Sequence, residues 1–145
     1  MKQLLLVSWL LSLSAILGLP EVKADVRMPL IFGNHMVLQQ DTRITIWGWA
    51  DAGENIEVLF AGQKVRTTAN ADGTWQVKLK PVKTKKKGET LTITGKNKLV
   101  YSDVLVGDVW VASGQSNMEW GIKVRKEYAD DIAHSEDSLL RLFFV

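Results

Sequence analysis

The stretch Asp72-Gly73-Thr74-Trp75-Gln76-Val77-Lys78-Leu79 decides the fold of the larger part of this chain. After the Asp-Gly turn signal, apolar and polar side chains alternate, and a period of two places one set on each face of a β-strand. The same alternation recurs in three other segments, 44–49, 56–60 and 90–94. Glycine, asparagine and aspartate residues separate these segments, as tight turns require. Short strands at such spacing predict an antiparallel β-sandwich over residues 25–104.

Residues 1–24 have the pattern of a secretory signal peptide. Met1-Lys2 supplies a charged start, an apolar run from Leu4 to Leu19 follows, and Pro20 ends it. Small residues then precede Asp25, and the run is shorter than the ~20 apolar residues that a membrane-spanning helix needs. We therefore expect cleavage before Asp25, export to the periplasm or the medium, and no stable membrane anchor afterwards.

Composition narrows the class of protein further. The chain of 145 residues contains no cysteine, which excludes disulfides, thiolate metal sites and a cysteine nucleophile. Its net charge is only +2 at pH 7, which argues against a nucleic-acid partner. The one basic run, Lys83 to Lys87, lies between a proline and a glycine and is expected to form a solvated loop tip.

The pattern changes after Val104. Val104 to Ala112 is almost continuously apolar, as in a strand buried on both faces, and residues 122–133 approximate helical spacing. Leu139 to Val145 resembles a second buried strand. This strand–helix–strand order predicts a βαβ unit, the start of an α/β domain over residues 105–145. Because so small a unit leaves most of its apolar faces open, we expect the sequence to be cut off inside its second domain.

A serine stands where that first buried strand is expected to give way to a helix. The residues Ser113-Gly114-Gln115-Ser116-Asn117 follow the apolar run. At such a corner backbone N–H groups are free, and the start of a helix favours negative charge. Ser116 is thus a candidate acyl-transfer nucleophile, with its own N–H as one oxyanion donor. The alternative is a serine that merely caps a helix.

The segment from Gly107-Asp108-Val109-Trp110 through Gly114-Gln115-Ser116-Asn117-Met118 resembles the nucleophile block of the sialate O-acetylesterase family, within the SGNH hydrolase superfamily. Three upstream motifs resemble the β-sandwich that precedes the catalytic domain there: Met36-Val37-Leu38-Gln39-Gln40, Trp47-Gly48-Trp49-Ala50 and Asp72-Gly73-Thr74-Trp75. The resemblance implies an enzyme that removes acetyl esters from sugars, sialic acids included, without a metal or organic cofactor. It implies Ser116 as nucleophile and backbone oxyanion donor, with Gly114, Gln115 and Asn117 shaping the corner around it.

The family's remaining catalytic blocks, which include a late Asp-x-x-His, have no counterpart in their expected places. Asp131-Ile132-Ala133-His134 has that spelling, but it belongs to the helix expected to lead away from Ser116. Such a helix carries His134 about 18 Å away, too far for a general base. His35 is expected to be a turn residue. The chain alone is therefore expected to be an inactive amino-terminal part, whether it is a fragment, a frameshift product or a degenerate gene.

A second function remains open. An exported, non-catalytic β-sandwich that binds glycans or a protein partner would fit the same strands. The tryptophans bear on this choice, because Trp47 and Trp49 share one strand face and Trp75 alternates with polar residues. Their default role is packing in the core or between sheets. If exposed, they could instead stack on sugar rings.

Overall fold

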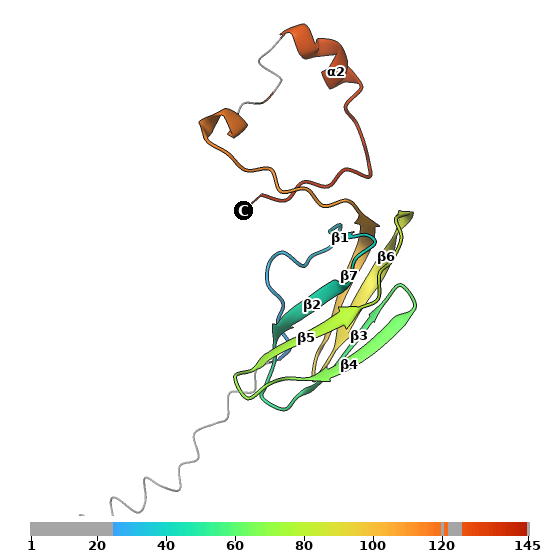
Figure 1. The fold of residues 1–145 in the computed structure, drawn as a ribbon, viewed down its shortest axis with the longest axis vertical. Coiled ribbons are helices and arrows are strands. Elements are labelled where there is room, and N and C mark those ends of the chain that lie inside the picture. Colours follow the sequence, from blue (N-terminus) through green and yellow to red (C-terminus); the bar gives the residue numbers. More distant parts are fainter. Residues whose placement is uncertain (1–24, 120, 122–125, 145) are drawn as a thin grey trace, which may run out of the picture.

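A computed structural model describes residues 25–119, 121 and 126–144, so the expected signal peptide lies outside the described residues. Strands dominate the first part: β1 (Val37–Gln39), β2 (Ile44–Trp49), β3 (Asn55–Phe60), β4 (Gln63–Thr68), β5 (Thr74–Leu79), β6 (Lys85–Thr94) and β7 (Lys98–Gly107). One sheet has the order β1-β7-β6-β3-β4, and β2 pairs with β5 in a second sheet (Figure 1). The expectation of a strand-dominated domain is confirmed.

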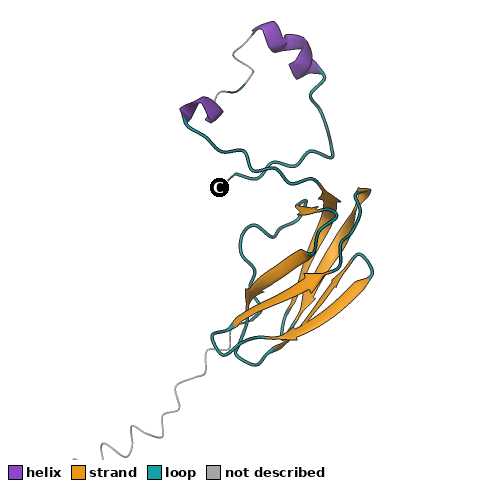
Figure 2. Ribbon diagram, in the orientation of Figure 1, coloured by secondary structure: helices purple, strands orange, loops and turns teal. Residues whose placement is uncertain are grey.

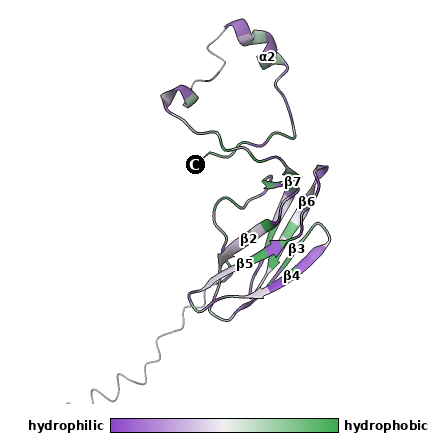
Figure 3. Cartoon of the chain, viewed as in Figure 1, coloured by the Kyte–Doolittle hydropathy of each residue, from purple (hydrophilic) through white to green (hydrophobic). Residues whose placement is uncertain are grey.

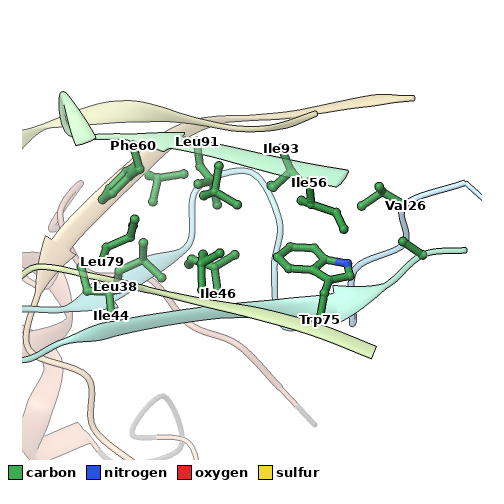
Figure 4. Packing of buried hydrophobic residues seen from close by; sticks show 14 of the residues in the cluster. Val26, Leu38, Ile44, Ile46, Ile56, Phe60, Trp75, Leu79, Leu91 and Ile93 are labelled. Atoms are coloured by element: carbon green, nitrogen blue, oxygen red, sulfur yellow. The ribbon is translucent and has the colours of Figure 1, made fainter. Parts of the chain in front are cut away.

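The core lies between these two sheets. Ile46 and Leu79 from the β2–β5 pair face Phe60 and Leu91 from the larger sheet, and all four side chains are fully buried (Figure 4). Close packing of aliphatic and aromatic groups removes their surface from water, which is the main force that stabilises a domain of this size.

One pairing corrects the expectation of an antiparallel arrangement. β1 runs parallel to β7, with Val37 opposite Leu105 and Gln39 opposite Gly107. β7 also continues beyond the boundary expected after Val104, and its last residues lie between β1 and β6. The apolar Val104–Gly107 segment therefore belongs to the first sheet and does not begin a new one.

The tryptophans divide between the two faces of the β2–β5 pair. Trp75 is 3% exposed and lies in the core, as expected. Trp47 and Trp49 lie on the outer face and are 41% and 37% exposed, so the default prediction of core packing is wrong for them. In the structure Ile44, Ile46 and Gly48 take the inner positions of β2, and the period of two then turns Trp47 and Trp49 outward.

β4 forms one edge of the larger sheet. It pairs with β3 along its whole length, from Asn55 opposite Thr68 to Phe60 opposite Gln63. Its exposed side chains are polar or charged, and Figure 3 shows the strand in hydrophilic colours. The basic run ends within this sheet: residues 85–87 are exposed and lie at the start of β6, not in the loop tip that was expected.

The βαβ unit predicted after Val104 is not formed by the described residues (Figure 2). Residues 108–115 and 139–144 contain no strand, and the helical part comprises η1 (Ser116–Glu119), η3 (Lys126–Tyr128) and α2 (Ala129–Ala133). A strand needs a neighbour to take up its N–H and C=O groups, and these two apolar runs do not pair. Their side chains are accordingly exposed, Trp110 to 87%.

Gly48, which lies between Trp47 and Trp49 in β2, provides a test of the close packing on the inner face of this strand. A Cβ at this position would lie 2.3 Å from the backbone oxygen of Arg27 and 3.2 Å from the Trp75 ring. Gly48→Ala should therefore lower the free energy of unfolding by about 1–3 kcal/mol, the usual cost of overpacking. Urea unfolding checks this, with Gly33→Ala as control because a Cβ at Gly33 meets nothing within 4 Å. Equal midpoints for the two variants would contradict the close approach.

Candidate active site

Ser116 follows the end of β7 at the far side of an irregular segment. It begins the short helix η1, where the N–H of Met118 donates to the Gln115 oxygen at 2.9 Å. Ser116, Gln115 and Asn117 are exposed, and within the part of the chain that the structure describes none of them forms a side-chain hydrogen bond. A Cβ on Gly114 would lie 2.6 Å from Met118 Cγ, so a glycine lets the turn close on that side chain.

The base of this segment is held by two consecutive glutamines at the end of β1. Gln39 Oε1 accepts the Val109 N–H at 2.8 Å, and Gln40 Nε2 donates to the Asp108 carboxylate at 3.1 Å. The Gln40 N–H also donates to the Gly107 oxygen at 2.9 Å. These contacts join the Met36–Gln40 motif to the Gly107–Val109 motif, although the two lie about 70 residues apart in sequence. Sequence reasoning singled out both motifs without predicting that they touch.

The two histidines lie on different segments of the chain. No described side chain forms a hydrogen bond with Ser116, so none is positioned to act as its general base. His134 ends α2, and its Nδ1 lies 2.7 Å from the Asp130 oxygen one turn earlier. This histidine is thus tied to its own helix. Among the described residues there is also no group of three acidic, histidine or cysteine side chains able to hold a metal ion.

His35 takes part in a cluster that sequence reasoning missed. It lies in a turn, as expected, with a left-handed φ of 63°, and Asp103 in β7 has a left-handed φ of 52°. His35 Nδ1 lies 2.7 Å from Asp103 Oδ2, and Arg141 Nη2 donates to the same oxygen at 2.8 Å. Arg141 thereby ties the segment near the carboxyl end to the larger sheet. The strand prediction at this position rested on the apolar residues around Arg141 and not on the charge of Arg141.

Electrostatics at this cluster follow from its geometry. The hydrogen bond with His35, followed by the charge of Arg141, holds the pKa of the Asp103 carboxyl below its usual value, while burial opposes that shift. A lowered folded-state pKa means that ionised Asp103 stabilises the fold at pH values above its unfolded pKa of about 3.9. That stabilisation is lost as the pH falls through the folded value.

Asp103→Asn should therefore unfold at lower urea concentration than the parent at pH 7, and the difference should shrink below about pH 4. Asp41→Asn is the matched control, since Asp41 also has a left-handed φ of 55° but forms no side-chain hydrogen bond with the described residues. Urea titrations at both pH values measure the effect. A difference that stays constant with pH would show that Asp103 acts through something other than its charge.

Comparisons with known proteins connect this geometry with a family, although no protein-family model matches the chain. The sialate O-acetylesterase of Rattus norvegicus is 37% identical over 128 residues, which is 77% of this chain and 23% of that protein. The human sialate O-acetylesterase is 36% identical over 104 residues, 64% of this chain and 20% of that protein. This chain is homologous to the sialate O-acetylesterases.

The structural comparison agrees with the sialate O-acetylesterase relationship. The crystal structure of a carbohydrate acetylesterase from Xanthomonas citri superposes with a TM-score of 0.71 at 35% identity. The match covers 78% of this chain and 26% of that protein. The chain thus spans about a quarter of the length of the sialate O-acetylesterases and the acetylesterase that it matches. No helix in the described part of the chain has the length and apolar character needed to cross a membrane.

Proposed function

We propose that this chain is the amino-terminal part of an exported carbohydrate O-acetylesterase that uses Ser116 as its nucleophile. The observation that carries the proposal is the anchoring of the Gly107–Val109 segment by Gln39 and Gln40. Motifs on both sides of this contact belong to the resemblance with sialate O-acetylesterases. The contact therefore joins the strand domain to the segment that presents the serine.

In the proposed reaction, Ser116 Oγ attacks the carbonyl carbon of an acetyl ester on a sugar, and the tetrahedral intermediate carries an oxyanion. The Ser116 N–H, which forms no hydrogen bond with a described residue at the start of η1, supplies one hydrogen bond to that oxygen. The sugar hydroxyl leaves with a proton, and an acetyl-serine remains. Water then attacks this ester and releases acetate, so that the serine is restored.

Both steps require a base, and the described residues place none against Ser116. We infer that a histidine and an orienting carboxylate from sequence beyond residue 145 complete the site. The support for this step is the length of the relatives, of which the chain spans about a quarter. The 145-residue chain alone should therefore hydrolyse esters only negligibly, since a serine without its base retains little catalysis.

The test of the nucleophile uses a protein extended to the length of its relatives. Ser116→Ala in that protein should lower kcat/KM on 4-nitrophenyl acetate and on O-acetylated sialic acid by about 10⁴-fold or more. Ser113→Ala is the matched control, because Ser113 is an exposed serine in the same segment and should leave kcat/KM nearly unchanged. Full activity of Ser116→Ala would remove the serine from the mechanism.

The competing function, an exported strand module that binds glycans or a protein without catalysis, predicts a different result. The extended protein would then show no esterase activity at all, and Ser116→Ala would not alter binding. The exposure of Trp47 and Trp49 favours this candidate as an additional function. It does not exclude catalysis, since the two tryptophans and the serine lie on different segments.

Export is part of the proposal, and the apolar run at residues 4–19 supports it. The mature protein should begin at Asp25, so the protein recovered from the periplasm or medium should lack residues 1–24. Intact-mass measurement of the secreted protein, compared with the same chain produced without the leader, provides the check. A recovered mass that includes the first 24 residues would argue for a membrane-attached form.

A further inference from the structure

The outer face of the β2–β5 pair is the surface from which a further function can be inferred. Trp47 lies opposite Gln76, and Trp49 lies opposite Thr74. Residues opposite each other in an antiparallel pair project from the same face, so these four side chains share one surface. All of them are at least partly exposed. We call this surface the tryptophan face.

The rings on the tryptophan face form a corner. The Trp47 and Trp49 ring centroids lie 5.6 Å apart with an interplanar angle of 75°. Phe32 stands against Trp47 in the same edge-to-face manner, at 6.3 Å and 80°. This packing fixes the rings without covering them, because both indoles keep more than a third of their surface exposed. A flat apolar ligand can therefore lie against one indole while the other bounds it.

Two cations border the rings. Arg27 forms an isolated antiparallel bridge with Trp49, which places its side chain on the same face, and Lys78 lies opposite Thr45 at the other end of β2. Both side chains are exposed, and neither forms a salt bridge with a described residue. The tryptophan face thus combines aromatic rings, an amide and two positive charges that no described acidic side chain pairs.

We propose that the tryptophan face binds an anionic pyranose, namely a sialic acid at the end of a glycan. The apolar face of the sugar ring packs on an indole, while the Gln76 amide exchanges hydrogen bonds with ring hydroxyls. The positive charges of Arg27 and Lys78 both attract the sugar carboxylate. The choice of sialic acid rests on the proposed function. The position of the site does not, because it depends on β2 and β5 and not on Ser116.

The experiment titrates the 145-residue chain with the α-methyl glycoside of N-acetylneuraminic acid, followed by tryptophan fluorescence and indole N–H NMR signals. Methyl β-galactoside is the neutral comparison. The sialoside should bind more tightly than the galactoside, and added salt should weaken its binding. Trp49→Ala should raise its Kd about tenfold. Trp110→Ala, which removes an exposed tryptophan elsewhere, should leave Kd unchanged.

Lys78→Gln and Gln76→Ala change exposed side chains that the core does not need, so they test the site even if the tryptophan variants fail to fold. Each should weaken sialoside binding, and Lys78→Gln should also reduce its salt dependence. Equal Kd values for both sugars would overturn the anionic ligand, and unchanged binding in these variants would overturn the site. Self-association that Trp49→Ala abolishes would identify a second copy as occupant and overturn the proposal. Because binding is measured without turnover, none of these results depends on whether Ser116 is a nucleophile.

Discussion

The parallel pairing of β1 with β7 is the contact on which the arrangement of this chain depends. Through it, residues 34–40 lie alongside residues 102–109. The backbone N–H of His35 donates to the Ser102 backbone oxygen, and the backbone N–H of Leu105 donates to the Met36 backbone oxygen. Further along, Gln39 and Gln40 hold Asp108 and Val109. One short strand thereby fixes both the His35–Asp103 pair and the base of the serine segment. Without this pairing, the carboxyl end of β7 would keep β6 as its only neighbour in the sheet.

The end of this pairing also divides the chain into two parts that are stabilised in different ways. Before Gly107 every strand has a hydrogen-bonded neighbour, and a buried core lies between the sheets. After Gly107 the described chain is held to the first part by a few polar contacts, among them the ion pair of Arg141 with Asp103. The apolar side chains of that second part are largely exposed. Its hydrophobic surface is therefore available for packing in a way that the surface of the core is not.

A strand could be predicted from the sequence when its own residues carry the pattern, but not when it depends on a partner far away in the chain. β2 and β5 were predicted correctly because strict alternation is a local property of their own residues. β1 was missed because it is short and depends on a partner nearly 70 residues away. β4 was missed because its inner positions include Gln63 and Thr67, which give no apolar alternation. The run from Val109 to Ala112 misled for the opposite reason: its apolar character specifies burial but not a strand to pair with.

The candidate site shows the same division. Ser116 was proposed from a contiguous motif, whereas the glutamines that hold its segment were noted only as part of another motif. The partner of His35 could not be predicted, because two left-handed residues from distant segments create that contact. The outward position of Trp47 and Trp49 follows from Gly48, whose missing side chain makes room for the Trp75 ring and the Arg27 carbonyl. A reader of the alternation alone sees three tryptophans and cannot tell which face is inside.

The charged edge strand β4 has a consequence for behaviour in solution. The free edge of a β-sheet offers unpaired N–H and C=O groups to any other strand, and natural proteins guard such edges with charge. Along β4 the exposed positions are occupied by Lys64, Arg66 and Thr68, and Glu57 on the neighbouring strand pairs with both cations. A strand from a second molecule would have to desolvate these groups before it could extend the sheet. The charged side chains along β4 therefore oppose the addition of further chains at this edge. The folded domain can be concentrated without polymerising there.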